Sequence, residues 1–277
     1  MLNLMYITNR PEIAQIAEAA GVDWIFVDME FIGKDLRQRG LDTVQNHHTF
    51  EDIVRIKKSV HQAKVLVRVN PIHDARPDYP SSKDEIEATI TAGADIVMLP
   101  YFKRVEEVSQ FLQYVDGRAK TCLLVETPES ALLIDKILEL DGIDMVHIGL
   151  NDLHLALGMK FMFELLADGT VDWLSEKIKK KGIPFGFGGI AKLEGGALPG
   201  AEVLKEHYRL GSSMVIIGRS FCNADKIKDI NEIRDIFQKG IAEIRQLEKE
   251  AEKASLYFSN NREKVLQSVS EIINQQW

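Results

Sequence analysis

The chain has 277 residues, of which 45% are hydrophobic and 27% charged, so it can bury a large α/β core and has an ordinary globular composition. Its formal net charge of −8 excludes a broad nucleic-acid-binding surface, because phosphate contacts need clustered Lys and Arg. The two cysteines, Cys122 and Cys222, exclude a disulfide scaffold and a cysteine-rich zinc site. The N-terminus lacks the pattern of a signal peptide and no apolar run is long enough to span a bilayer, so we expect a cytoplasmic protein with no membrane partner.

Short apolar runs alternate with amphipathic helical segments along the chain. The first run is followed by Asn9, which can cap a helix, and by Pro11, which fits a first helical turn. Similar cap patterns at Thr49, Ser82 and Thr127 open later helices. Strands are expected at residues 2–7, 24–30, 64–71, 95–100, 121–126, 144–149, 183–189 and 212–218.

Eight strands that alternate with helices over about 220 residues predict an α/β protein with a closed (β/α)8 TIM barrel. The rival architecture is an open doubly wound sheet, but its dinucleotide fingerprint is absent, because the glycine cluster at residues 186–189 has the wrong spacing. We expect residues 1–224 to form the catalytic barrel. Residues 225–277 are charged and helical in pattern, and we expect them to form a barrel-covering helix and an oligomerisation arm.

Two consecutive predicted strands lead into carboxylates, Glu126 and Asp152. Taken singly, Asp152 could cap a helix and Glu126 could pair with a distant arginine. Taken together, the two acids favour a shared Mg²⁺ or Mn²⁺ ion, because these cations prefer oxygen ligands. In a barrel the carboxyl ends of all strands meet at one face. The charged residues expected at that mouth are Asp28, Glu30, Arg68, Glu126, Asp152 and Arg219.

A divalent cation at this mouth could polarise the carbonyl group of a 2-oxo acid. Arg68, near the end of the third strand, could then stabilise negative charge on the keto oxygen as an enolate forms. The structural alternative is an ion pair from Arg68 to Asp28 or Glu30, and the two roles are compatible. The glycines at the end of the seventh strand, Gly188 and Gly189, form a turn that could approach substrate.

Five segments, at residues 20–30, 67–71, 92–100, 125–127 and 148–153, are similar in order and spacing to one known group of proteins. The chain resembles the metal-dependent (class II) pyruvate aldolase and citrate lyase beta-subunit superfamily, the HpcH/HpaI group. The resemblance implies that Glu126 and Asp152 hold Mg²⁺ or a similar ion and that Arg68 holds the keto oxygen. The Arg-Val-Asn-Pro form of the third strand, which contains Asn70, is more like the citrate lyase branch.

One position departs from the pattern of that family. The hydroxy-oxo-acid aldolases carry a histidine directly after the Asp-x-Glu motif, where this chain has Phe31. The acid–base group is therefore absent or comes from elsewhere, with His48 as the first candidate and His73 as the second. Histidine pairs before a helix cap are commonly polar surface, which is the alternative for His47 and His48. His147 lies inside a strand and is expected in the core.

These features predict an enzyme, a carbon–carbon lyase or aldolase that acts on a pyruvate- or oxaloacetate-like 2-oxo acid through a divalent-metal-stabilised enolate. Two alternatives stay open: citrate-lyase-like cleavage or formation of an acyl-CoA thioester, and a non-catalytic aldolase-like barrel. The predicted catalytic residues are Arg68, Glu30 and His48, the predicted substrate-binding residues are Arg68, Asn70, Gly188 and Gly189, and the predicted metal ligands are Glu126 and Asp152.

The tail is longer than one barrel-covering helix requires. Apolar residues recur in it at near-helical spacing, among them Leu256, Val265, Val269, Ile272 and Ile273. We expect most of this stripe to lack a surface of its own chain to cover and to bury against a partner. A homo-oligomer follows, and the resemblance implies a trimer or hexamer. The alternative is a tail that folds back across its own barrel.

Overall fold

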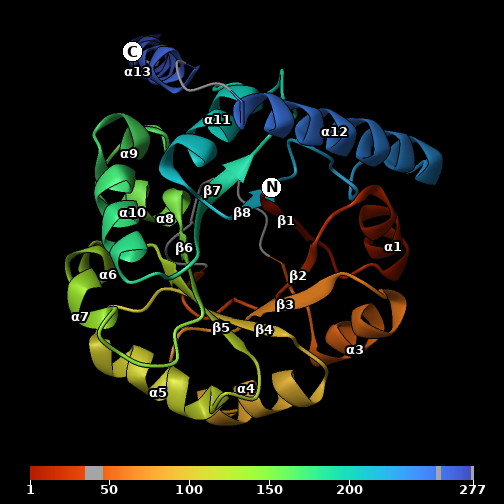
Figure 1. Cartoon of the computed structure of the whole chain (residues 1–277). Helices are drawn as coiled ribbons and strands as arrows, with labels where there is room; N and C mark the ends of the chain where they lie inside the picture. Colours follow the sequence, from red (N-terminus) through yellow and green to blue (C-terminus); the bar gives the residue numbers. More distant parts are fainter. Residues whose placement is uncertain (35–45, 254–256, 276–277) are drawn as a thin grey trace.

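The computed structural model describes residues 1–34, 46–253 and 257–275, and Figure 1 shows it along the axis of a ring of strands. The strands are parallel and follow one another around the ring in chain order, with β8 closing onto β1. This architecture confirms the predicted (β/α)8 TIM barrel. The strands are β1 (Asn3–Ile7), β2 (Trp24–Asp28), β3 (Lys64–Arg68), β4 (Ile96–Leu99), β5 (Lys120–Val125), β6 (Met145–Ile148), β7 (Phe185–Ile190) and β8 (Met214–Ile217).

Helices surround the barrel and connect consecutive strands on its outside (Figure 1). Two long helices, α12 (Ile230–Ala251) and α13 (Tyr257–Gln275), follow the last strand. Among the described residues, no helix is both long and apolar enough to cross a bilayer. The helices that precede the last strand are α1 (Pro11–Ala20), α3 (Phe50–Ser59), α4 (Ser82–Thr91), α5 (Val105–Val115), α6 (Pro128–Leu132), α7 (Ile134–Ile137), α8 (Leu150–Ala156), α9 (Glu164–Ala167), α10 (Thr170–Lys180) and α11 (Gly200–Leu210).

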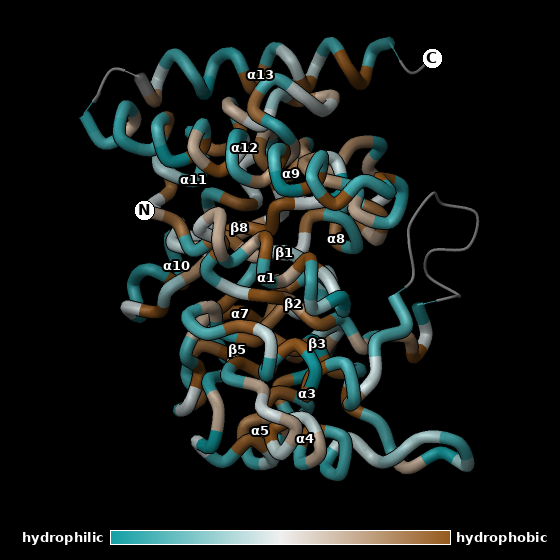
Figure 2. The backbone as a smooth tube through the Cα atoms, turned by 90° about the vertical axis from the view of Figure 1, so that its right-hand side faces the viewer, coloured by the Kyte–Doolittle hydropathy of each residue, from teal (hydrophilic) through white to brown (hydrophobic). Residues whose placement is uncertain are grey.

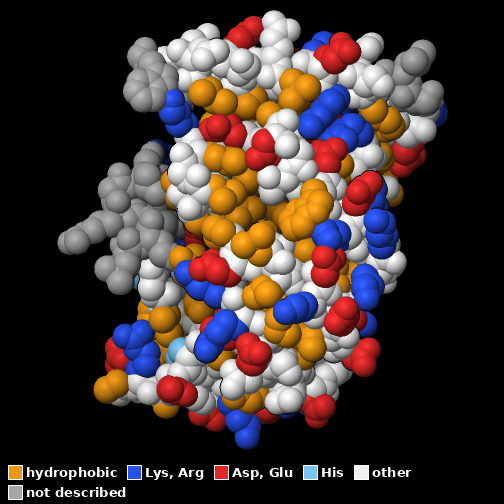
Figure 3. All heavy atoms as spheres, turned by 90° about the vertical axis from the view of Figure 1, so that its left-hand side faces the viewer, with side chains coloured by type: hydrophobic (Ala, Val, Ile, Leu, Met, Phe, Trp, Pro, Cys, Tyr) orange, Lys and Arg blue, Asp and Glu red, His pale blue; other side chains and the backbone are white. Residues whose placement is uncertain are grey.

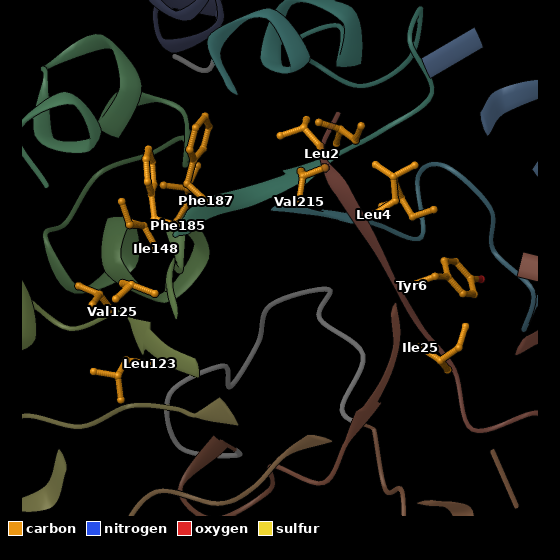
Figure 4. Packing of buried hydrophobic residues seen from close by; sticks show 14 of the residues in the cluster. Leu2, Leu4, Tyr6, Ile25, Leu123, Val125, Ile148, Phe185, Phe187 and Val215 are labelled. Atoms are coloured by element: carbon orange, nitrogen blue, oxygen red, sulfur yellow. The ribbon is translucent and has the colours of Figure 1, made fainter. Parts of the chain in front are cut away.

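Side chains along each strand alternate between the barrel interior and the layer of helices. On β5, Cys122 and Leu124 belong to the interior cluster, whereas Leu123 and Val125 belong to the larger cluster under the helices. Figure 4 shows the labelled outward side chains pointing from the strands away from the barrel axis. The same alternation directs Glu126, one residue beyond the strand, toward the barrel mouth, as the sequence predicts.

Two predicted helix caps are confirmed with their hydrogen bonds. The Thr49 hydroxyl accepts the Asp52 backbone N–H at 3.3 Å, and the Asp52 carboxylate accepts the Thr49 N–H at 2.8 Å. Thr127 accepts the Ser130 N–H at 3.0 Å and begins α6 in the same way. In each case the cap satisfies a backbone donor that the first helical turn leaves without a partner.

Two other predicted caps are wrong by one residue. Arg10 occupies the cap position of α1, and the Asn9 amide N–H donates to the Asp52 carboxylate at 3.3 Å. Ser81 caps α4 in place of Ser82. The Ser82 hydroxyl instead accepts a hydrogen bond from the His73 backbone N–H in the preceding loop. In both places the side chain expected to cap makes a hydrogen bond outside the helix.

The C-terminal helices pack on helices of their own barrel, which corrects the expectation that most of the tail has no such surface to cover. α12 contacts α1 and α11, and α13 contacts α11 and α9. Figure 2 shows α13 as the outermost layer above these helices. Val265 and Val269 are buried by this packing, whereas Leu266 stays 39% exposed. Leu256 lies outside the described residues.

A buried carboxylate joins α12 to the start of the barrel. Glu248 is fully buried, and its Oε1 accepts the Leu2 backbone N–H at 2.7 Å and the Tyr208 hydroxyl at 3.0 Å. Its Oε2 accepts a hydrogen bond from Arg245 Nη1 at 2.8 Å. One side chain thus ties α12 to β1 and α11.

We expect Glu248→Ala to lower the free energy of unfolding by about 3 kcal/mol, because it leaves the buried Leu2 N–H and the Tyr208 hydroxyl without their acceptor and removes one of the two carboxylates that pair with Arg245. Glu243→Ala is the matched control, since Glu243 is an exposed member of the same helix that lies 4.0 Å from Lys239. The control should change stability by less than about 0.5 kcal/mol. Chemical denaturation measures both, and equal midpoints for the two variants would contradict the role of Glu248.

Candidate active site

A cavity of about 440 Å³ opens at the carboxyl ends of the strands, where the sequence places the site. Arg68, His48, Glu126 and Asp152 line it, as does Arg219. A larger hollow of about 1080 Å³ runs along α12 and includes none of the predicted site residues. The predicted site residues that do not line the mouth cavity are Glu30, Asn70, Gly188 and Gly189.

The Arg68 guanidinium holds the Asp28 carboxylate through two parallel hydrogen bonds. Nε donates to Oδ1 and Nη2 donates to Oδ2, each at 2.8 Å. The pairing follows from strand register, because β2 and β3 set Asp28 beside Arg68 at the ends of both strands. Arg68 Nη1 also lies 3.3 Å from the Glu30 carboxylate. The ion pair considered as the structural alternative is therefore present.

Further donors converge on the same buried carboxylate. Lys34 Nζ lies 3.2 Å from Asp28 Oδ2 and 3.4 Å from Glu30 Oε2, and Asn46 Nδ2 donates to Asp28 Oδ2 at 2.8 Å. Burial by itself would raise the pKa of Asp28, but the charges of Arg68 and Lys34 and these hydrogen bonds hold that pKa far below its usual range. Asp28 is thus a permanently charged group that orients two cations.

Arg68 keeps hydrogen-bond donors for a ligand despite this pairing. A guanidinium has five N–H groups, of which Asp28 takes two and Glu30 lies near a third. The remaining N–H groups are on Nη1 and Nη2, and 16% of the side chain is exposed toward the cavity. Burial opposes the charge, but the Asp28 and Glu30 carboxylates raise the pKa of Arg68 well above its usual value. Arg68 is therefore a fixed cation that lines the cavity and keeps N–H groups beyond those paired with the two carboxylates.

The backbone at the end of β2 holds the His48 side chain. The Asp28 backbone N–H donates to His48 Nδ1 at 3.0 Å. A nitrogen that accepts a hydrogen bond carries no proton, so the neutral ring has its N–H on Nε2. Burial lowers the pKa of His48 below its ordinary value, and the nearby Asp28 charge opposes this only in part. In this geometry the neutral His48 ring can donate a hydrogen bond through Nε2, and its Nδ1 lone pair is taken by the Asp28 N–H.

Glu126 and Asp152 face the cavity from the ends of neighbouring strands. Glu126 follows β5, and Asp152 lies in the first turn of α8, directly after β6. The Glu126 Oε1 accepts the backbone N–H of Tyr101, which adopts a left-handed φ of 47°. A Cβ on Gly149 would meet Glu126 Cβ at 2.7 Å and Oε2 at 2.9 Å. Glycine at this position therefore makes the space that the Glu126 carboxylate fills.

The residues at this corner fit a hard divalent cation. Their donors are carboxylate oxygens, which Mg²⁺ and Mn²⁺ prefer, and glycine at position 149 brings one carboxylate against the start of the helix that carries the other. Within the described ranges, no group of three or more His, Cys, Asp and Glu side chains is placed to hold a metal. A metal on Glu126 and Asp152 would thus complete its coordination with water and substrate oxygens.

Asn70 shapes the turn that carries the Asp-x-Glu motif. Its Oδ1 accepts the backbone N–H groups of Phe31 and Ile32, each at 2.9 Å. Its Nδ2 donates to the buried carboxylate of Glu85 at 2.8 Å, and Tyr79 donates to the same oxygen at 2.9 Å. Burial raises the pKa of Glu85. These contacts give Asn70 a structural task, and its predicted contact with substrate stays a prediction.

The glycines of β7 allow close packing. Gly188 has a φ of +47°, and a Cβ there would meet Leu150 Cδ1 at 2.7 Å. A Cβ on Gly189 would approach the carbonyl oxygen of Ile216 to 3.0 Å. His147 is buried as predicted, and its Nε2 lies 3.0 Å from the Gly188 carbonyl oxygen. A role of Gly188 and Gly189 in binding substrate stays a prediction.

Sequence reasoning missed two residues whose side chains contact the Asp28 and Glu30 carboxylates. Lys34 is buried beside Glu30, and the four-residue spacing of this pair was the available signal. Asn46 carries no such signal, because only the tertiary fold brings it to Asp28. Of the other histidines, His73 uses both ring nitrogens against loop carbonyl oxygens, and His47 is exposed outside the cavity lining.

The sequence profile of a protein family described as HpcH/HpaI aldolase/citrate lyase matches residues 3–164. No curated protein matches the chain at a significant level.

Three solved structures show the same architecture. An HpcH/HpaI aldolase from Desulfitobacterium hafniense DCB-2 is similar with a TM-score of 0.58 and 17% identity, over 88% of this chain and 93% of that one. Citrate synthase SbnG has a TM-score of 0.57 and 17% identity, over 88% and 92%. A citrate lyase beta subunit from M. tuberculosis, complexed with oxaloacetate and magnesium, has a TM-score of 0.56 and 17% identity, over 86% and 97%. At these identities the likeness shows the fold.

We expect Gly149→Ala to displace the Glu126 carboxylate and to destabilise the protein by about 1–3 kcal/mol, because the new methyl group overlaps atoms near the backbone of Glu126. Gly218→Ala, at the end of β8, is the matched control, since its Cβ would meet nothing closer than 3.8 Å. Thermal unfolding compares the two variants. A Gly149→Ala protein as stable as the control would show that Glu126 has room to move.

Proposed function

Since the family profile covers more than half of its residues, the chain belongs to the HpcH/HpaI aldolase/citrate lyase family, and we propose that it is a carbon–carbon lyase acting on a 2-oxo acid. The observation that carries this proposal is that Arg68 shares one cavity with the carboxylates of Glu126 and Asp152. The similar citrate lyase beta subunit, complexed with oxaloacetate and magnesium, supports an oxo acid and a divalent ion as ligands.

Glu126 and Asp152 would hold Mg²⁺ or Mn²⁺. When bound, such an ion supplies Lewis acidity that polarises a carbonyl group. The chain's own contribution is to fix the two carboxylates at neighbouring strand ends, with Glu126 held by the Tyr101 N–H and the space at Gly149. Rigid placement of this kind is what gives a charged site its effect, because little reorganisation is needed when charge develops.

Arg68 would bind the keto oxygen through the N–H groups that Asp28 and Glu30 leave available. As the substrate becomes an enolate, negative charge grows on that oxygen and the charge-assisted hydrogen bonds strengthen. Asp28 keeps the guanidinium plane fixed through its two 2.8 Å hydrogen bonds. Glu30 would act through Arg68 and Lys34, since it lies 3.3 Å from the first and 3.4 Å from the second.

His48 would donate a hydrogen bond to substrate and would not remove a proton. Its Nδ1 is engaged by the Asp28 N–H, and Phe31 stands where the resembling aldolases carry their histidine. Aldol cleavage of a 4-hydroxy-2-oxo acid requires a base for the hydroxyl proton, and that help is worth roughly 10²–10⁴-fold. We therefore propose that this site favours reactions in which no hydroxyl proton has to be removed. One such reaction is decarboxylation of a 2-oxo acid whose C4 is a carboxylate. The C3–C4 bond breaks, C4 leaves as CO₂, the bonding electrons stay on the enolate, and the enolate then takes a proton.

The enolate chemistry predicts that the protein with Mg²⁺ exchanges the methyl protons of pyruvate with D₂O, with solvent in the open cavity as the proton acceptor and His48 taking no part, because stabilisation of the enolate lowers the barrier to loss of the methyl proton. Glu126→Gln and Asp152→Asn should each abolish specific metal binding and slow the exchange by roughly 10²-fold or more, because a neutral amide replaces a charged ligand. Calorimetry measures the metal and proton NMR measures the exchange. Glu129→Gln is the control, since Glu129 is an exposed acid near the same corner that pairs with Lys103 at 3.2 Å.

The outcomes separate this proposal from its alternatives. Unchanged metal affinity in both variants would refute the metal assignment. Metal binding without exchange of any 2-oxo acid would favour a non-catalytic barrel. Exchange only after addition of an acyl-CoA thioester would favour the citrate-lyase-like alternative.

We also propose that the chain forms a homo-oligomer through the side of the barrel shown in Figure 3, where apolar side chains gather among charged ones. Large exposed apolar residues lie on elements of that side, namely Leu132 (78% exposed), Leu157 and Trp173. Residues 225–277 would contribute through Leu266 of α13.

We expect light scattering of the full chain to give the mass of a trimer or hexamer. Leu132→Lys should reduce that mass with little effect on folding, because an exposed side chain contributes little to the stability of its own chain. Glu243→Lys, on α12, is the control and should leave the mass unchanged. A monomeric mass for the native protein at micromolar concentration would refute the proposal.

A further inference from the structure

A buried acid outside the mouth cavity, Glu85, has partners on one of its two oxygens. It lies in α4, is fully buried and does not line the cavity. Its Oε1 accepts three hydrogen bonds, from the Asn70 backbone N–H at 3.1 Å, from Asn70 Nδ2 at 2.8 Å and from the Tyr79 hydroxyl at 2.9 Å. Its Oε2 is also buried and has no hydrogen-bond partner in the part of the chain that the structure describes.

This asymmetry fits a neutral carboxylic acid better than a carboxylate. A carboxylate shares its negative charge between both oxygens, so a buried Oε2 without a donor would be costly. A carboxylic acid has one carbonyl oxygen, which accepts, and one hydroxyl group, which donates. Thr89 lies four residues further along the same face of α4, and its buried Oγ1 is likewise without a partner among the described residues. With Oε1 as the carbonyl oxygen and Oε2 as the hydroxyl, that face of the helix carries a donor as well as an acceptor.

Few charges surround Glu85. α4 packs on α3, α5 and β4, and α5 and β4 bury apolar side chains alone. α3 buries one acid, Asp52, and β3 ends in one cation, Arg68, and both are paired with other residues. The titratable groups that act on Glu85 from the loop between β3 and α4 are Tyr79 and His73. Burial raises the pKa of Glu85, and its hydrogen bonds and the His73 charge oppose this only in part.

Asn70 connects Glu85 to the mouth of the barrel. The Asn70 Oδ1 accepts the two backbone N–H groups that follow Glu30, each at 2.9 Å, so the amide can only direct Nδ2 toward Glu85. The Glu30 carboxylate in turn lies 3.3 Å from Arg68 Nη1. The placement of Glu30 against Arg68 therefore depends on a turn that Asn70 holds, and Asn70 is itself held by Glu85.

We propose that Glu85 is a neutral carboxylic acid in the folded protein and a positioning residue for the reaction, acting through Asn70 on Glu30 and Arg68. The part that concerns the reaction rests on the proposed function. A neutral acid suits this task, because it accepts the hydrogen bonds of Asn70 and Tyr79 without burying an uncompensated charge. Glutamine reproduces such an acid, with a carbonyl oxygen and a donor on one planar group, whereas alanine removes both.

Protonation can be observed directly. Carbon NMR of the chain labelled at the glutamate carboxyl carbons should show one signal that keeps the chemical shift of an acid at neutral pH and is absent from Glu85→Gln. A carboxyl signal at the ionised position for every glutamate would overturn this part of the inference.

Stability gives a second readout of protonation. The folded state keeps Glu85 neutral and the unfolded chain ionises it, so the stability this group contributes is present below its unfolded pKa and is lost as pH rises toward its folded pKa. The midpoint of urea unfolding of Glu85→Gln, relative to the native protein, should therefore rise between pH values of about 5 and about 7. Glu87→Gln is the matched control, since Glu87 is an exposed acid of the same helix, and its relative midpoint should not rise. A relative midpoint of Glu85→Gln that falls over this range would show an ionised Glu85.

The positioning role is tested by exchange of the pyruvate methyl protons with Mg²⁺ present. Glu85→Gln should keep kcat within about twofold, whereas Glu85→Ala should lower it about tenfold, because the turn that places Glu30 loses its support. The Mg²⁺ affinity should not change, since Glu126 and Asp152 lie at the ends of other strands. If Glu85→Ala does not fold, Glu85→Asp tests the same contact, because its shorter side chain draws the acceptor away from Asn70.

The outcomes separate positioning from a general structural role. Full exchange activity in a folded Glu85→Ala or Glu85→Asp protein would refute the positioning role, as would a loss of Mg²⁺ affinity equal to the loss of exchange. A Glu85→Gln protein as impaired as Glu85→Ala would refute the neutral acid. Absence of exchange in the native protein would refute the proposed function and with it the positioning role, whereas the protonation of Glu85 is decided separately by NMR.

Discussion

The ion pair between Asp28 and Arg68 is the constraint on which the rest of the mouth depends. Two charges buried at the ends of adjacent strands are tolerated because each satisfies the other with two 2.8 Å hydrogen bonds. Loss of either partner would remove the two strongest hydrogen bonds of the remaining charge, which would keep only Lys34 and Asn46 against Asp28, or Glu30 against Arg68. The pair also fixes its surroundings, since Lys34 and Asn46 bind the same carboxylate and the Asp28 backbone holds His48.

This constraint has chemical consequences. A carboxylate that accepts hydrogen bonds from two cations and an amide keeps a low pKa and is a poor base. A histidine whose Nδ1 is engaged by a backbone N–H is a donor at Nε2. The network therefore contains fixed positive charges and poor bases. Such groups suit stabilisation of an enolate better than deprotonation of a hydroxyl group. The departure at Phe31 is consistent with the same arrangement, since the acid–base histidine of the resembling aldolases is not among the groups gathered here.

The two sides of the cavity are built differently. On the β5 and β6 side, Glu126 is held by a strained Tyr101 backbone and by the space at Gly149, which suits ligands that need fixed distances. On the β8 and β1 side, Arg219 and Asp225 are exposed and extend into the cavity. A barrel allows this division because each strand end is followed by an independent loop.

The sequence by itself determined the barrel and the place of its site. Alternating apolar runs and capped helices fix the order of the elements, and parallel strands in a closed barrel must gather Asp28, Arg68, Glu126 and Asp152 at one mouth. These are consequences of local periodicity and of topology, which the order of residues specifies. The wrong caps at Asn9 and Ser82 mark the limit of such reasoning. Asn9 hydrogen-bonds to the distant Asp52, and Ser82 hydrogen-bonds to His73 in the preceding loop.

Only the tertiary structure decided which groups pair and which stay available. Arg68 and Arg219 look equivalent in the sequence, since both follow or end a strand with no acid beside them. Register places Asp28 against Arg68, whereas no described carboxylate reaches Arg219. The tautomer of His48, the structural use of Asn70 and the packing of α13 on its own barrel were likewise decided by contacts between distant segments. Such contacts depend on distances of a few ångströms, and residue order fixes those only through the completed fold.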